Sequence, residues 1–143
     1  DGSERMHTGA SNELWSYGED AYEILRKFVD IREALRPYLR TLMQSAHTDG
    51  QPIIRGLFYE FPEQDRAWLC NDQYMLGPDL LVAPVLHPGA TERTVWLPEG
   101  VNWVDLRDGT LYEGGTEILS PAPLNTLPVF TKQGHCEELL GML

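Results

Sequence analysis

Apolar positions recur three and four residues apart over a long stretch near the start of the chain. They are Ala21, Ile24, Phe28, Ile31, Leu35, Tyr38, Leu42 and Ala46. This spacing matches the turn of an α-helix and places all eight side chains on one continuous face. We therefore expect helical structure over residues 21–46, with one apolar side that needs a partner surface.

The ends of this helical stretch carry their own signals. Ser16 followed three residues later by Glu19 is a candidate capping box, which predicts the helix start. Asp49-Gly50 predicts the stop, because glycine readily adopts the left-handed conformation at a helix end. Pro37 lacks a backbone N–H, so we expect either a break near Arg36 or one kinked helix.

After Gly50 the pattern changes to short strand-like runs separated by turn residues. Asp108-Gly109 between two runs predicts a tight hairpin, and the run between Pro78 and Pro84 predicts a buried strand. The last nine residues, 135–143, predict a short helical turn or a frayed end. The expected strands are Ile53 to Phe61, Leu80 to Leu86, Thr94 to Leu97, Trp103 to Leu106, Thr110 to Tyr112, Glu117 to Leu119 and Leu127 to Thr131.

These patterns predict an α+β fold with a helical segment followed by an antiparallel β-sandwich. The sandwich can build its own core, whereas the helical segment cannot. Its apolar face either rests on the sheet of this chain or belongs to a larger barrel that the chain does not include.

The chain has 143 residues, of which 42% are hydrophobic, so it can bury a real core. Its formal net charge of −11 disfavours nucleic acid and anionic membranes as partners and suits a neutral partner such as a sugar. No apolar stretch reaches the roughly 20 residues of a membrane helix. Cys70 and Cys136 are too few for a disulfide framework and are expected to be free thiols.

Catalytic and metal-binding patterns are scarce. No phosphate-binding glycine loop, nucleophile elbow or pair of histidines at i, i+4 occurs, so we expect no cofactor and no metal. Asp72, Asp79 and Asp105 adjoin apolar or aromatic runs and are interpreted as partly buried carboxylates at turns or strand ends.

The four tryptophans support two interpretations. Large aromatic side chains supply much of the buried area of a small core, which is the expectation for Trp68, Trp96 and Trp103. Trp15, just before Ser16, is expected to fix the start of the helix. Sugar rings also stack on flat aromatic faces, so an exposed tryptophan would favour sugar binding instead.

Several motifs occur in the order typical of one enzyme family. They are Asn12-Glu13-Leu14-Trp15-Ser16-Tyr17-Gly18-Glu19, Ile31-Arg32-Glu33-Ala34-Leu35-Arg36-Pro37-Tyr38, Leu57-Phe58-Tyr59-Glu60-Phe61-Pro62, Gln73-Tyr74-Met75-Leu76-Gly77-Pro78-Asp79-Leu80-Leu81-Val82-Ala83-Pro84-Val85 and Leu127-Pro128-Val129-Phe130. From about Arg5 to about Gly134, the chain resembles the C-terminal part of glycoside hydrolase family 31. Five motifs in order make the resemblance specific.

The resemblance implies that residues 1–49 end a (β/α)₈ catalytic barrel and that residues 50–143 form the β-sandwich after it. Family members are retaining α-glycosidases that use an aspartate nucleophile and an aspartate acid/base. The Trp-x-Asp-Met-Asn-Glu motif that carries the nucleophile is absent here, so no catalytic residue is assigned. Arg5-Met6-His7 resembles the family's Arg-x-His motif, which implies that His7 contacts substrate, although Thr8 stands where the family usually has glycine.

The leading hypothesis is therefore a fragment of an α-glucosidase or α-xylosidase whose own role is mainly structural and which is inactive alone. Its carbohydrate substrate would bind through the missing barrel. A stand-alone carbohydrate-binding module is the alternative. A third hypothesis is an interaction protein, with helix 21–46 docking a partner or a second copy by its apolar face.

The sequence says little about location. Asp1-Gly2-Ser3-Glu4 shows no signal peptide, which favours the cytoplasm, but an excised fragment would show none either.

Overall fold

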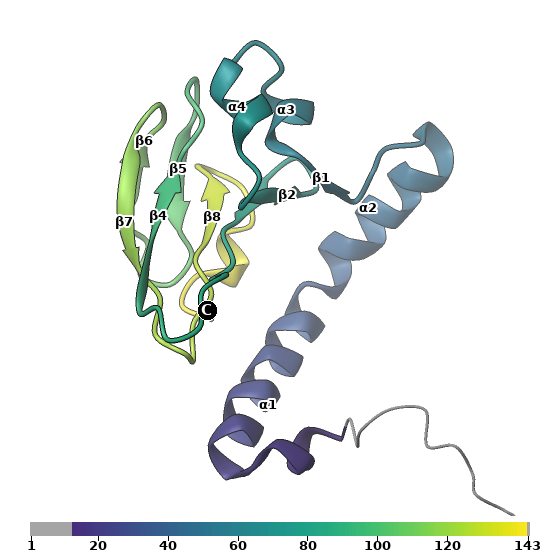
Figure 1. Cartoon of the computed structure of the whole chain (residues 1–143). Helices are drawn as coiled ribbons and strands as arrows, with labels where there is room; N and C mark the ends of the chain where they lie inside the picture. Colours follow the sequence, from purple (N-terminus) through teal and green to yellow (C-terminus); the bar gives the residue numbers. More distant parts are fainter. Residues whose placement is uncertain (1–12, 143) are drawn as a thin grey trace, which may run out of the picture.

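A computed structural model describes residues 13–142, which form a two-helix arm beside a β-sandwich (Figure 1). The α+β class predicted from the sequence is confirmed. In chain order the elements are η1 (Leu14–Tyr17), α1 (Glu19–Ala34), α2 (Arg36–Asp49), β1 (Ile54–Arg55), α3 (Leu57–Glu60), α4 (Asp65–Leu69), β2 (Tyr74–Leu76), β3 (Leu80–Val82), β4 (Glu92–Trp96), β5 (Asn102–Asp105), β6 (Leu111–Glu113), β7 (Glu117–Pro121), β8 (Val129–Lys132) and η2 (Glu137–Leu139).

The arm consists of α1 and α2, which are separated by a break at Leu35. Pro37 sits in the first turn of α2, where its missing N–H costs nothing. The predicted interruption is therefore confirmed, one residue before the expected place. Gly50 ends α2 with a φ of 69°, which confirms the left-handed stop.

The predicted capping box at the start of the arm is wrong. Ser16 lies in η1, where its hydroxyl donates to the carbonyl of Glu13 at 2.7 Å. Gly18, with a φ of 92°, turns the chain between Ser16 and Glu19, so α1 begins at Glu19 with a glycine at its cap. The positive φ of the intervening glycine keeps the serine out of capping position.

The sandwich contains two antiparallel sheets. The larger has the strand order β1-β2-β3-β8-β5-β6, and β4 and β7 form the smaller one. Strands β5 and β6 form the predicted hairpin, and Gly109 in their turn has a φ of 78°. The predicted helical turn near the C-terminus is also confirmed, as η2.

The expected strand from Ile53 to Phe61 is wrong over most of its length. Only Ile54–Arg55 is strand, and the next residues form the short helix α3. Leu57 and Phe61 are both buried, whereas Tyr59 is exposed. A strand would place Tyr59 on the same face as Leu57 and Phe61, but a helical turn buries the outer two and leaves the middle one at the surface.

Strand β3 explains the apolar run bracketed by prolines. Leu81 faces the core between the two sheets, alongside Trp103 and Phe130. Leu80 and Val82 face the other way, into a second cluster that includes residues of the arm and of η2. All three side chains are buried because the strand has a neighbouring layer on each face, which removes the usual alternation of apolar and polar positions.

Two arginines tie the sheets together at the margins of this core. Arg93 on β4 donates to the backbone carbonyl and carboxylate of Asp72, and to the carbonyl of Pro84. Arg107 after β5 pairs with the buried carboxylate of Asp105 and donates to Ser120 on β7. Each guanidinium therefore joins the smaller sheet to segments that flank strands of the larger one.

Candidate functional site

The junction between the arm and the sheet is built around Gly77, in the turn between β2 and β3. Gly77 has a φ of 65°, and a Cβ there would lie 2.4 Å from the hydroxyl oxygen of Tyr38 and 2.6 Å from a methyl of Leu42. Glycine is therefore required twice, for the turn and for the close approach of α2. The motif around Gly77 therefore forms the turn against which helix α2 packs.

Tyr38 and Asp79 form the polar part of this junction. The Tyr38 hydroxyl lies 3.0 Å from the carbonyl oxygen of Leu76 and 3.3 Å from the Asp79 carboxylate, and it accepts a hydrogen bond from the Asp79 backbone N–H. Nδ1 of His135 lies 3.0 Å from the other Asp79 oxygen. One carboxylate thus joins α2, the β2–β3 turn and the segment after β8.

Burial shifts the pKa of two groups at the junction. It raises the pKa of Tyr38, and the negative charge of Asp79 adds to the effect. It also raises the pKa of Cys136 to about 11, with contributions from Asp79 and Glu138. Both groups are therefore neutral near pH 7, and neither is activated as a nucleophile or base.

The three aspartates singled out from the sequence all have partners. Asp105 is 1% exposed and paired with Arg107, and Asp72 is paired with Arg93. Asp79 holds the junction described above. The predicted position at a turn or strand end is confirmed for all three, since Asp72 and Asp79 precede β2 and β3 and Asp105 ends β5. Of the three carboxylates, that of Asp105 accepts a backbone N–H, from Arg107.

Glu60 forms a further charged cluster, on the motif that contains α3. Its carboxylate pairs with Arg55 and lies 3.9 Å from Nζ of Lys132. Arg55 also stacks over Tyr59, 5.0 Å from the ring centroid. The acid has a basic partner on each side, so the cluster fixes α3 on the sheet and leaves no free carboxylate for acid or base chemistry.

The burial of the tryptophans differs from the prediction at one position. Trp96 and Trp103 are buried, as predicted, but Trp68 is 60% exposed, so its placement in the core is wrong. Ala67 takes the buried position on the short helix α4, which leaves the neighbouring Trp68 outside. Trp15 lies in η1 beside the start of α1 and is 72% exposed.

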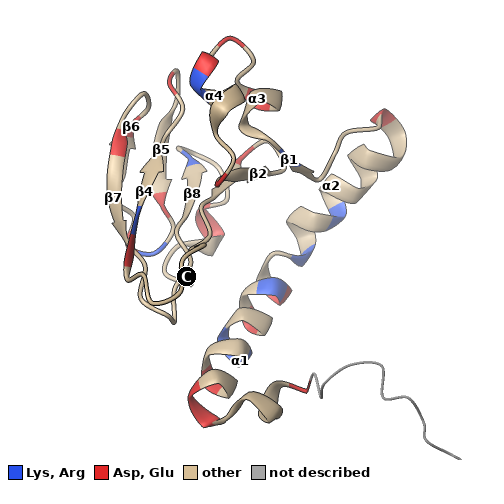
Figure 2. Ribbon diagram, viewed as in Figure 1, with Lys and Arg blue, Asp and Glu red and all other residues tan. Residues whose placement is uncertain are grey.

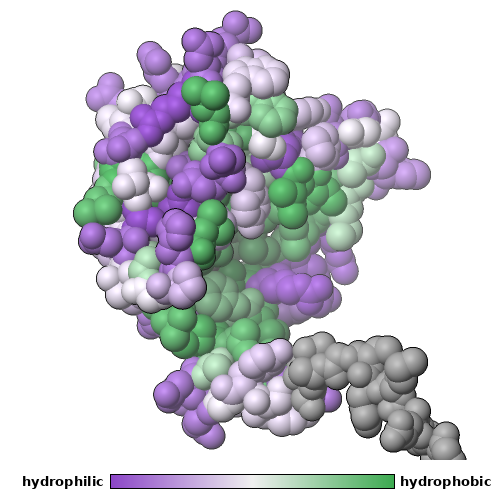
Figure 3. Space-filling model, viewed as in Figure 1, coloured by the Kyte–Doolittle hydropathy of each residue, from purple (hydrophilic) through white to green (hydrophobic). Residues whose placement is uncertain are grey.

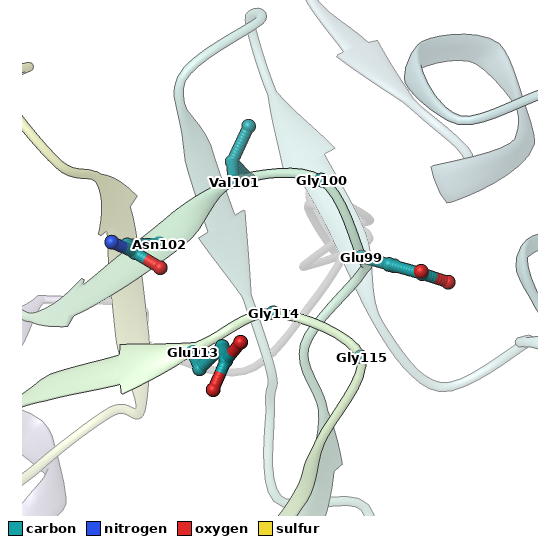
Figure 4. Close-up of a pocket in the computed structure, with 7 residues that line it drawn as sticks. All are labelled: Glu99, Gly100, Val101, Asn102, Glu113, Gly114 and Gly115. Carbon is teal, nitrogen blue, oxygen red and sulfur yellow. The ribbon is translucent and has the colours of Figure 1, made fainter.

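A polar hollow of about 630 Å³ lies between the loops β4–β5 and β6–β7 (Figure 4). Its lining consists of Glu99, Gly100, Val101, Asn102, Glu113, Gly114 and Gly115. A Cβ on Gly114 would lie 2.3 Å from the carbonyl oxygen of Pro98, so the two loops can approach only with glycine there. The loops are neighbours because Trp96 pairs with Glu117 across β4 and β7 and Asn102 pairs with Glu113 across the hairpin of β5 and β6.

An apolar cavity of about 200 Å³ separates α1 from the sheet. Phe28, Ile31 and Leu35 line it from the arm, and Leu80, Val82 and Val129 are among those that line it from the sheet. Figure 3 shows hydrophobic surface in the recess between the arm and the sandwich. The arm thus rests partly on the sheet of this chain, through one part of its apolar face.

Charge is distributed unevenly over the arm (Figure 2). Acidic residues lie at both ends, including Glu19, Asp20 and Asp49, and basic residues lie along the middle, where Asp30 and Glu33 are interspersed with them. Within residues 13–142 no group of three or more histidine, cysteine, aspartate or glutamate side chains is arranged to hold a metal ion. Over the same range no helix is long and apolar enough to cross a membrane.

The remaining predictions concern single residues. Cys70 and Cys136 are free thiols, as expected. His7, proposed from the motif as a substrate contact, lies outside the described residues. Glu60, Asp72 and Asp105 are held in ion pairs, whereas Glu99 and Glu113 line the polar hollow.

Comparison with known proteins gives a consistent result. A model of the glycosyl hydrolase family 31 C-terminal domain matches residues 50–136. Alpha-glucosidase 2 of Bacillus thermoamyloliquefaciens is 39% identical over 127 residues, which are 89% of this chain and 16% of that protein. An alpha-xylosidase of Saccharolobus solfataricus is 32% identical over 138 residues, which are 96% of this chain and 19% of that protein.

Solved structures agree. An α-xylosidase from a soil metagenome, complexed with xylose, has a TM-score of 0.88 and 49% identity, covering 92% of this chain and 20% of its own. A Flavobacterium johnsoniae dextranase complexed with isomaltotriose has a TM-score of 0.84 and 42% identity, covering 88% of this chain and 16% of its own. The chain thus spans a fifth or less of the length of these relatives. With its order of motifs, its sandwich and its docked helical arm, the chain belongs to glycoside hydrolase family 31.

Proposed function

We propose that this chain is the C-terminal portion of a retaining α-glycosidase of the α-glucosidase or α-xylosidase type. The match of residues 50–136 to the family's C-terminal domain carries the proposal. The relatives named above are several times longer than this chain, which supports a parent protein with a catalytic region outside it. In that parent the substrate is an α-linked carbohydrate, and no cofactor takes part.

The proposed domain division places residues 1–49 at the end of the catalytic barrel and residues 50–143 in the sandwich. The left-handed stop at Gly50 supports this boundary. Burial supports it as well, because α1 and α2 each bury one residue, Ile31 and Leu42, whereas the sandwich has a continuous core of its own. Helices that bury so few residues within their own chain are expected to pack against a further part of the parent protein.

The proposed role of this portion is to hold the last helical segment of the barrel in position. Gly77, Tyr38 and Asp79 dock α2 onto the sandwich at a fixed place. The segment that precedes the arm carries His7, which we propose as a substrate contact of the parent enzyme. Fixing the arm would then fix one wall of the substrate pocket.

The chain alone is expected to have no glycosidase activity. Retaining hydrolysis needs two carboxylates on opposite sides of the scissile bond, and the Trp-x-Asp-Met-Asn-Glu motif that carries the nucleophile in the family does not occur in these 143 residues. The test is the release of nitrophenol from nitrophenyl α-glucoside and α-xyloside by the purified chain. Measurable turnover that co-purifies with the chain would overturn this part of the proposal.

The proposal for the parent is tested by the reading frame upstream of the codon for Asp1. A frame that carries Trp-x-Asp-Met-Asn-Glu at barrel spacing, and whose full product hydrolyses one of these two substrates, is the expected result. In that product, His7→Ala should lower kcat/KM by about tenfold or more, because a hydrogen-bonded substrate contact is lost. An unchanged kcat/KM would remove His7 from the site.

A further inference from the structure

Phe58 and Trp68 form an exposed, stacked aromatic pair. Their ring centroids lie 4.8 Å apart with an interplanar angle of 19°, and the side chains are 40% and 60% exposed. The pair stands on the short helices α3 and α4, at one end of the sandwich (Figure 1). Aromatic rings this exposed usually have a second surface to contact.

The pair is held in place from both sides. Trp68 donates its indole N–H to the carbonyl of Pro62 at 2.9 Å, which fixes the plane of the indole ring. A Cβ at Gly56 would lie 2.4 Å from the Phe58 ring, so the ring packs closely over the glycine. The two rings are stacked on each other, so each covers part of one face of its neighbour, and this packing orders both side chains before a ligand binds.

The polar hollow described above lies at the same end of the sandwich. The loop between α3 and α4 is joined to it by Gln64, whose amide donates to the carbonyl of Glu99 at 3.0 Å and accepts from the Glu99 backbone N–H at 2.9 Å. Glu99, Asn102 and Glu113 contribute carboxylates and an amide around the hollow (Figure 4). The loop between the two aromatic helices is thus bonded to a loop that lines the hollow.

We propose that the Phe58–Trp68 pair, with the adjoining hollow, is an accessory binding site for a neutral α-glucan chain. The proposal rests on the function proposed above, in which the parent enzyme acts on an α-linked carbohydrate. The C–H face of a pyranose ring is apolar and packs on the indole face, while its hydroxyl groups need carboxylate and amide partners. The acidic surface, with a net charge of −11, disfavours anionic polymers at the same place.

The test is affinity electrophoresis of the chain in native gels that contain dextran or soluble starch. Retardation that grows with polysaccharide concentration is the expected result. Trp68→Ala should weaken binding by roughly tenfold, the usual effect of losing a central aromatic contact. Trp68→Phe, which keeps a ring on Phe58, should restore part of the affinity. Trp15→Ala is the matched control, since Trp15 is another exposed tryptophan, in η1 (72% against 60% for Trp68), and its loss should have no effect.

Two results would overturn the proposal. One is the same mobility with and without either polysaccharide, and the other is unchanged retardation of Trp68→Ala. Sizing at several concentrations identifies the competing occupant, because loss of a dimer in Trp68→Ala without any glucan effect would make the pair a protein contact. Hydrolysis of a nitrophenyl glycoside by the parent does not involve Trp68, so this accessory site can fail while the proposed enzymatic function stands.

Discussion

The arm and the sandwich bury their apolar side chains to different extents. In the sandwich, Trp103, Phe130 and Leu97 have no exposed surface, and they pack between the two sheets. In the arm, Val29 is 42% and Met43 is 59% exposed. The difference indicates that the sandwich is stable through its own core, whereas the arm depends on its docking to the sheet and on surfaces beyond this chain.

The largest expected effect is on stability, when a side chain is removed from the core of the sandwich. Trp103→Ala removes a fully buried ring and its hydrogen bond to the carbonyl of Pro98, so it should lower the free energy of unfolding by about 3–5 kcal/mol. Urea unfolding followed by circular dichroism measures this loss. If stability changed by less than about 1 kcal/mol, the core would not be the source of the fold's stability.

The next effect separates docking of the arm from backbone strain. Gly77→Ala and Gly50→Ala both place a side chain at positive φ, which costs about 1–2 kcal/mol each. Only at Gly77 does the new methyl displace Tyr38 and Leu42, which should add about 1–3 kcal/mol. Hydrogen exchange of the α2 amides should rise in Gly77→Ala more than in Gly50→Ala, and equal exchange would mean that the approach at Gly77 does not hold the arm.

A smaller effect concerns alkaline pH at the same junction. The pKa of Cys136 is raised from 9.0 to about 11, so the folded state favours the neutral thiol. Its stabilising contribution is present below pH 9 and is lost as the pH rises to 11. Urea unfolding between pH 8 and 11 should show stability falling less steeply in Cys136→Ala than in the unaltered chain. Some slope should remain, since the pKa of Tyr38 and of Tyr74 is raised too.

The smallest expected effect is on the outer face of the arm. Met43→Glu should change the free energy of unfolding by less than about 0.5 kcal/mol, because the side chain is already exposed. Sizing over a range of concentrations tests the hypothesis that the apolar face of residues 21–46 docks a second copy. Met43 is not one of the eight positions of that face, so Met43→Glu should leave this self-association in place. A monomer at every concentration would contradict self-association of the arm.

Local patterns predicted the elements whose signals lie within a few residues. The break before Pro37, the stop at Gly50 and the hairpin turn at Gly109 depend on backbone preferences of single residues. The capping box failed at one such residue, because Gly18 turns the chain before the helix begins. These outcomes depend on φ, which glycine and proline determine most strongly.

Features that depend on distant parts of the chain could not be predicted in this way. Trp68 adjoins the buried Ala67 on a single helical turn, and which of the two faces the core is decided by the sheet beneath. The predicted β5–β6 hairpin brings one side of the polar hollow together, but the β4–β7 register that completes it is not evident in the sequence. The motif around Gly77 was recognised by resemblance, but its physical role depends on Tyr38, about forty residues earlier along the chain.

Arg93 and Arg107 have a consequence for redesign of this domain. Each guanidinium spans several carbonyl or carboxylate oxygens contributed by segments of both sheets. Because a lysine ammonium cannot reproduce that fork of donors, exchange of either arginine for lysine would leave some of these oxygens without a partner. When strands are exchanged between relatives, each arginine and its acceptor residues should therefore be taken from the same parent sequence.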